Sequence, residues 1–119
     1  MANTITATAS LRWTSTQDSL AMSVTQATTQ IGTNAIGNVQ RIGITAEQIL
    51  LGDVTTIGFL GFKNKDTVNS VRIGNDPSVS VAVYTLAPGQ GTIVPTRVTS
   101  WYAVADVAPV DLLIMAIEL

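Results

Sequence analysis

The acidic side chains are the main candidates for chemistry in this sequence, because the usual catalytic and metal-binding partners do not occur in it. The 119 residues include 8 Asp and Glu, but His and Cys are both absent. Ser-His-Asp and Cys-His catalysis, a disulfide framework and a Cys/His zinc site are therefore excluded. What remains is carboxylate chemistry such as glycoside hydrolysis, which needs two acids facing one another across a sugar.

The residues around these acids favour turns over a catalytic pair. Asp53, Asp66 and Asp76 have Gly or Asn beside or close to them, where an Asp side chain accepts hydrogen bonds from its own backbone. The Asn/Asp clusters at residues 64–69 and 75–76 offer the hard oxygen ligands of Ca²⁺, but each contains a single acid and lacks the spacing of an ion-binding loop. We therefore predict that the chain is not an enzyme and has no catalytic residue, metal site or cofactor.

Three large aromatic residues and one cation are the candidate binding residues. Core packing is the default prediction for Trp13 and Trp101, but Trp, Tyr and Arg are also enriched where subunits meet. Arg12 and Trp13 are neighbours in a predicted strand and point to opposite faces, so one of them should face outward. The candidate subunit-interface residues are Arg12, Trp13, Trp101 and Tyr102. As an alternative, Trp101 and Tyr102 form the stacking platform of a carbohydrate-binding module.

Short strands are the elements that would position these residues. Apolar residues from Ile5 to Trp13 alternate with polar ones, which predicts a half-buried strand or an extended N-terminal arm over residues 1–13. The polar segment Thr14–Ser19 then reads as a flexible spacer before a strand over residues 20–24. Residues 46–51 fit either one helical turn, with Thr45 and Gln48 as a capping box, or a strand. Further strands are expected at residues 39–45, 59–63, 70–73, 79–84, 91–94, 101–105 and 110–118.

This pattern predicts a single all-β domain over residues 1–119. Eight to ten short strands, with turn signals about every ten residues and no long helix between them, are typical of a β-sandwich. Turns are expected at Gly32-Thr33-Asn34, Gly37-Asn38 and Ala87-Pro88-Gly89, among others. We expect jelly-roll-like connectivity.

The chain carries unusually little charge. Charged residues make up 12% of the sequence and the formal net charge is −2, whereas a typical soluble domain has about 25% charged residues. A surface this poor in charge favours a protein that is covered by neighbours over a lone monomer. The six scattered cations give no footprint for nucleic acid. Neither a secretory signal nor a membrane-spanning segment is expected.

One stretch resembles small virion structural proteins of tailed bacteriophages. The resemblance rests on Gly52-Asp53-Val54-Thr55-Thr56-Ile57-Gly58 leading into a strand, the turn Asn64-Lys65-Asp66, the turn Leu86-Ala87-Pro88-Gly89, and the final segments 101–105 and 110–114. It covers roughly residues 45–119 and offers no catalytic residue to carry over. It implies a structural role in the virion, assembled in the host cytoplasm, on a compact β-sandwich.

Within that resemblance, the first expectation is a capsid decoration (cement) protein that binds the assembled shell of the major capsid protein and stabilises it. A head- or tail-attached fibre or spike component is the alternative, with the carbohydrate-binding module as a rival from another class. We also expect a homo-oligomer, with a trimer favoured by analogy with other viral β-sandwich proteins. The N-terminal segment is expected to add a strand to the sheet edge of a neighbouring subunit.

Overall fold

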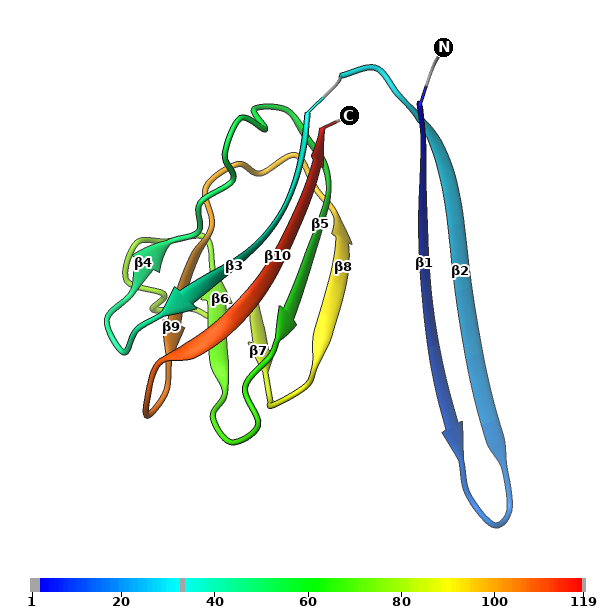
Figure 1. Ribbon diagram of the computed structural model, residues 1–119. Helices are drawn as coiled ribbons and strands as arrows, with labels where there is room; N and C mark the ends of the chain where they lie inside the picture. Colours follow the sequence, from blue (N-terminus) through cyan, green and yellow to red (C-terminus); the bar gives the residue numbers. More distant parts are fainter. Residues whose placement is uncertain (1–2, 33, 119) are drawn as a thin grey trace. The chain divides into compact units, whose positions relative to one another are not determined.

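The alternating segments fold as strands throughout the computed structural model, which describes residues 3–32 and 34–118 (Figure 1). These residues form ten strands, all paired antiparallel, and no helix. The all-β prediction is therefore confirmed. The strands are β1 (Asn3–Thr14), β2 (Ser19–Gln30), β3 (Ala35–Ile42), β4 (Glu47–Gln48), β5 (Ile57–Asn64), β6 (Val71–Gly74), β7 (Tyr84–Leu86), β8 (Gly91–Pro95), β9 (Tyr102–Ala105) and β10 (Val110–Glu118).

Two compact units make up the chain, Met1–Ile31 and Gly32–Leu119. The first contains the hairpin β1–β2, and the second contains the other eight strands. The single domain over residues 1–119 stays a prediction.

The N-terminal unit is a long hairpin in which β1 and β2 pair over their whole length, from Asn3 with Gln30 to Thr14 with Ser19. The turn between them is closed by Ser15 and Asp18. The Ser15 Oγ accepts the Asp18 N–H at 3.0 Å, and the Asp18 Oδ1 accepts the Ser19 N–H at 2.8 Å. The segment Thr14–Ser19 is therefore a structured turn and not a flexible spacer. The expected N-terminal strand is present, and it pairs with the next segment of its own chain.

The second unit is a β-sandwich of two four-stranded sheets, with the orders β3-β10-β5-β8 and β4-β9-β6-β7. In Figure 1 the first sheet lies in front and the second lies behind it. Every other residue of β10 points inward, namely Val110, Leu112, Ile114 and Ala116, and these four are fully buried. The core continues with Leu60 and Phe62 from β5 and with Val71 and Ile73 from β6, so it joins the two sheets.

Local sequence patterns misplace three segments. Residues 79–83 alternate like a strand, but the strand β7 begins only at Tyr84, because Val79 adopts a positive φ of 50° in a turn closed by Asp76. The expected turn at Gly37-Asn38 is instead part of β3, where Gly37 lies opposite Met115 of β10. Of the segment 46–51, only Glu47–Gln48 pairs, as the short strand β4, so the helical turn and its capping box are wrong.

Candidate interaction surfaces

The Asp76 carboxylate organises a turn and is fully occupied in doing so. Its Oδ2 accepts the Ser80 N–H at 3.0 Å, the Ser78 hydroxyl at 2.7 Å and the Ser80 hydroxyl at 2.9 Å. The Ser80 backbone N–H and then the Ser78 hydroxyl stabilise the charged form, and they hold the pKa of Asp76 far below its usual value. A carboxylate with so low a pKa stays ionised near neutral pH and is a poor proton donor there.

Asp66 and Asn64 hold the neighbouring turn in the same way. The Asp66 Oδ2 accepts backbone N–H groups from Asn69 at 2.6 Å and from Val68 at 2.9 Å, and these bonds lower the pKa of Asp66. Asn64 is fully buried; its Nδ2 donates to the carbonyls of Asn69 and Leu86, and its Oδ1 accepts the Asp66 N–H. The side chains of Asn64 and Asp66 therefore hold the turn together, as predicted for Asp66.

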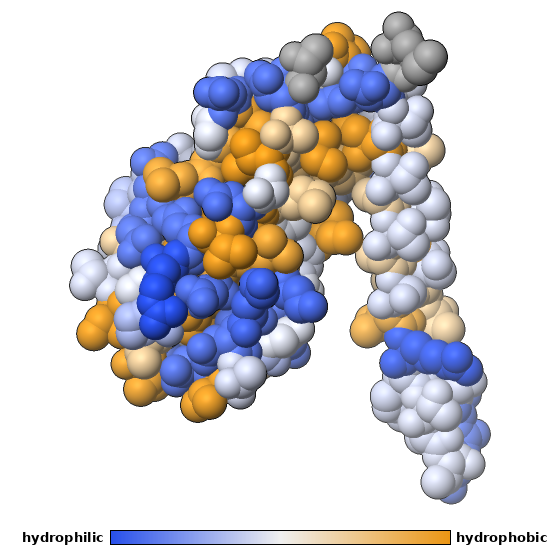
Figure 2. All heavy atoms as spheres, in the orientation of Figure 1, coloured by the Kyte–Doolittle hydropathy of each residue, from blue (hydrophilic) through white to orange (hydrophobic). Residues whose placement is uncertain are grey.

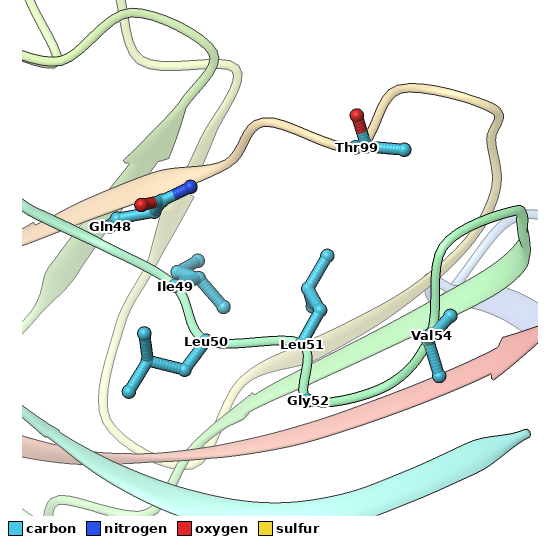
Figure 3. A pocket seen from close by; sticks show the side chains of 7 residues that line it. All are labelled: Gln48, Ile49, Leu50, Leu51, Gly52, Val54 and Thr99. Atoms are coloured by element: carbon cyan, nitrogen blue, oxygen red, sulfur yellow. The ribbon is translucent and has the colours of Figure 1, made fainter.

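Metal-ligating side chains do not cluster in the described part of the chain. Residues 3–32 and 34–118 contain no group of three or more His, Cys, Asp or Glu side chains that could hold a metal ion. A pocket of about 490 Å³ opens beside the loop after β4, lined by residues 48–52, Val54 and Thr99 (Figure 3). Its lining is aliphatic apart from Gln48, Thr99 and backbone, so it offers no titratable group for general acid or base catalysis.

Trp101 belongs to the core of the sandwich. Its side chain is 3% exposed, its ring centroid lies 5.7 Å from that of Phe62 and 6.2 Å from that of Tyr84, and its Nε1 donates to the Val98 carbonyl at 2.8 Å. Tyr102 is half-buried and lies opposite Gly74 of β6. A buried Trp beside a half-buried Tyr cannot present two rings to one sugar. This geometry speaks against the stacking platform that the carbohydrate-binding alternative requires.

The hairpin carries one apolar face, which we call the hairpin face. Residues directly opposite in an antiparallel pair point to the same side of the sheet, and the register places apolar residues opposite one another along this side. Leu11 pairs with Met22, Trp13 with Leu20, and Ala9 with Val24. Five large members of this face, all near the turn, are between 52% and 69% exposed: Leu11, Trp13, Leu20, Met22 and Val24. Farther from the turn, Ile5 lies on the same side opposite Thr28 and is 6% exposed.

The other side of the hairpin is polar. Arg12 lies there opposite Ala21, with Thr8 opposite Thr25 and Ser10 opposite Ser23. Both Arg12 and Trp13 are exposed. Of the four predicted interface residues, these two therefore lie on the hairpin, on opposite faces, whereas Trp101 and Tyr102 lie in the sandwich.

The exposed hairpin face leaves a large hydrophobic contribution unused. Fully burying a Val, Leu, Met or larger apolar side chain stabilises by about 1.5–3 kcal/mol. Five such side chains, each more than half exposed, therefore represent roughly 5–9 kcal/mol that a covering partner would recover. A two-stranded hairpin is at best marginally stable in water without such cover.

The sandwich has a second exposed apolar surface, on the outer side of the β3-β10-β5-β8 sheet. Met115 lies between Gly37 and Gly61, and Gly61 lies opposite Ile93 on the other side. Figure 2 shows apolar side chains gathered over this face of the sandwich. Val39, Ile93 and Met115 are 45%, 51% and 51% exposed. We call this the outer patch: Val39, Gly61, Ile93, Leu113, Met115 and Ile117.

The opposite sheet has a different outer side. There Arg72 of β6 donates from its Nε to Asp106 Oδ1 at 3.2 Å and lies opposite the exposed Thr85 of β7. An antiparallel sheet commonly has one packed face and one polar, solvated face. The β4-β9-β6-β7 sheet follows that pattern at these positions, whereas the outer side of the β3-β10-β5-β8 sheet combines the outer patch with Lys63 and the exposed ion pair of Arg41 with Asp111. The outer patch is therefore the unusual surface of the sandwich.

Comparison of the chain with protein-family models, with curated proteins and with solved structures gives no match. Among the described residues, no helix is long and apolar enough to cross a membrane. Arguments about function therefore rest on the geometry of the two apolar surfaces.

Most residues of these surfaces were not singled out by the sequence. The continuous apolar run Leu112–Ala116 was a usable signal for the outer patch, because strands that are covered on both faces have such runs. The signal for the hairpin face was the alternation on both sides of Ser15–Asp18, which requires that the two segments pair.

Proposed function

We propose that the chain is a non-enzymatic structural protein of a bacteriophage virion, a capsid decoration (cement) protein that binds the assembled shell of the major capsid protein and stabilises it. The observation that carries the proposal is the outer patch. From Leu112 to Ile117 the strand β10 is apolar on both sides, yet within the described chain only one side is packed in a core. A contiguous exposed apolar patch of this kind marks an interaction site.

Strand pairing supports a jelly-roll connectivity for the sandwich. The first strand of this unit pairs with the last, β3 with β10, and inside that pair β4 pairs with β9, β5 with β8, and β6 with β7. A jelly roll is expected to have these pairs along one long antiparallel ribbon, rolled up so that β10 also meets β5 and β9 also meets β6. Jelly rolls occur in viral capsid domains and also in lectins.

Low charge supports attachment through apolar contact. The charged fraction of 12% leaves few groups for ion pairing. On this side of the sheet Lys63 lies opposite Leu113, and Arg41 already pairs with Asp111 of the same chain. Salt does not screen apolar contacts, whereas exposed charges separated by more than a Debye length, about 10 Å at 0.1 M, are largely screened from one another. Attachment to the shell is therefore expected to persist at high ionic strength.

Binding to the assembled shell stabilises it by mass action. A ligand that binds the shell and not the dissociated capsid subunits contributes RT ln(1 + [L]/Kd) per site, about 2.7 kcal/mol at a concentration of a hundred times Kd. Summed over many copies, this opposes the outward pressure of packaged DNA. No catalytic group, metal or cofactor is needed for such a role.

The test compares phage particles with and without the protein during heating. Particles that lack it should release DNA at a lower temperature, and added protein should restore the release temperature in low and high salt alike. The Met115→Asp variant places a charge in the outer patch and should fail to restore it. Thr85→Asp is the matched control, because it puts the same charge on the other sheet, and it should restore release fully.

Equal release temperatures with and without the protein would contradict the cement function. A copy number of about a dozen or fewer per particle would favour the fibre or spike component instead, since a decoration protein covers a shell of many equivalent sites.

A further inference from the structure

The hairpin face has a composition that distinguishes it from a surface made for a charged partner. Within residues 3–30 the charged side chains are Arg12 and Asp18. Arg12 belongs to the polar side, opposite Ala21, and Asp18 belongs to the turn. The apolar side is therefore free of charged side chains along its full length, so electrostatic complementarity cannot select its partner.

This composition is typical of the interface between identical subunits. Interfaces between partners that also exist separately are about as polar as ordinary surface, whereas homo-oligomer interfaces are more apolar and poor in charge. A decoration protein and a finished shell exist separately before they meet. A surface as apolar as the hairpin face therefore fits a second copy of the same chain better than it fits the shell.

The dimensions also suit association between copies. Strands of 12 residues are ~40 Å long at ~3.4 Å per residue, and two of them give a ribbon roughly 10 Å wide. One face thus projects ~400 Å², and its accessible area is larger because the side chains stand out from it. The projected area is about half of the ~800 Å² that each partner buries in a standard stable interface, and the apolar pairs lie at residues 9–13 and 20–24, near the turn.

We propose that copies of this chain associate by packing their hairpin faces against one another. Sheet packs on sheet with Leu11, Trp13, Leu20 and Met22 interdigitating near the turn, and the Thr and Ser residues of the other side remain in water. The choice of a second copy as the partner rests on the proposed structural role. The contact between the two hairpin faces forms without a capsid shell. The proposal assigns the predicted self-association to the hairpin face, which contains Trp13 and does not contain Trp101.

Two charge-insertion variants of the full chain test the proposal. Leu11→Asp places a carboxylate on the hairpin face, and Ser10→Asp, one residue earlier in β1, places it on the polar side. At tens of micromolar, the wild type and Ser10→Asp should sediment as species of two or more copies, in low and high salt. Leu11→Asp should sediment at the monomer mass of 12.5 kDa.

The fluorescence of Trp13 gives a second measurement that needs no destabilised variant. Trp13 is 52% exposed in the single chain, and Trp101 is buried in the core. When the wild type is diluted until its copies dissociate, Trp13 becomes exposed to water and the fluorescence emission should shift to longer wavelength. Trp13→Phe should abolish this shift and leave the emission of Trp101.

Three results would overturn the proposal. These are a wild type that stays at the monomer mass at 100 micromolar, equal sedimentation of Leu11→Asp and Ser10→Asp as oligomers, or an emission that does not change on dilution. If the wild type is monomeric and Leu11→Asp also fails to restore the DNA-release temperature, the hairpin face binds the capsid protein instead. If Leu11→Asp is monomeric and no variant affects DNA release, self-association holds and the cement function is wrong.

Discussion

The hairpin of residues 3–30 and the sandwich of residues 34–118 use the same alternation of apolar and polar residues, with opposite results for burial. In β10 the alternating residues Leu112 and Ile114 are fully buried, whereas in β1 the alternating residues Leu11 and Trp13 are 69% and 52% exposed. The difference lies in the number of strands, because eight strands in two sheets enclose a core and two strands do not. Alternation predicts which face seeks cover, and it does not say whether the same chain supplies that cover.

The largest difference between the two regions is expected for large-to-small substitutions. Leu112→Ala removes a fully buried side chain and should lower the free energy of unfolding by about 2–5 kcal/mol. Leu20→Ala, on the hairpin face and 65% exposed, should cost less than about 0.5 kcal/mol in the dissociated chain, as exposed positions do. Urea denaturation measures both losses, at a protein concentration low enough that the chains are dissociated. Equal losses would mean that the hairpin face is covered within a single chain.

A medium effect is expected at the buried polar group of the sandwich. Asn64→Ala leaves the carbonyls of Asn69 and Leu86 without their side-chain donor and should cost about 1–3 kcal/mol. Asn75→Ala is the matched control, because Asn75 is exposed and donates to the Ser100 carbonyl at 3.3 Å. Thermal unfolding of the two variants should differ clearly. A similar melting temperature for both would show that water replaces the network around Asn64.

The smallest effect is expected in acid, where the Asp76 turn loses its charge. The folded-state pKa of Asp76 lies below the unfolded value of 3.8, chiefly because of the Ser80 N–H and the Ser78 hydroxyl. Its contribution to stability is therefore fully present above about pH 5, and it is lost as the pH falls through 3.8 and on toward the folded-state pKa. Asp76→Asn should lessen this acid dependence in urea titrations between pH 2 and 7, and Ser78→Ala should lessen it by a smaller amount. A dependence unchanged in both variants would contradict the assignment.

Sequence patterns predicted the strands well wherever pairing partners agreed with local preference. The alternation from Ile5 to Trp13 and the apolar run in residues 110–118 both became strands. Val79–Val83 alternates equally well but became a loop, because Asp76 gathers Ser78 and Ser80 into a turn and leaves Val79 at positive φ. Gly37-Asn38 favours a turn locally, and pairing with β10 overrides that preference.

The candidate site was harder to predict than the strands. Trp13 and Arg12 were selected by residue type, and the structure places them on a surface of the hairpin. Trp101 was selected for the same reason, but it packs against Phe62 and Tyr84 in the core. Residue type alone cannot separate these cases, because burial depends on strand pairing between residues far apart in the sequence. The outer patch likewise depends on β3 and β5 pairing with β10 and on β8 pairing with β5.

Hydrogen exchange of the full chain at two concentrations is the most direct test of the contrast between the regions. Where copies associate, amides that pair β1 with β2, such as those between Ala9 and Val24, should exchange slowly, like those around Leu112 in the sandwich. When the protein is diluted until its copies dissociate, the hairpin amides should exchange at least tenfold faster, while the sandwich amides keep their exchange rates. Hairpin amides that exchange at one rate at both concentrations, whether slow or fast, would contradict the claim that other copies of the chain stabilise the hairpin.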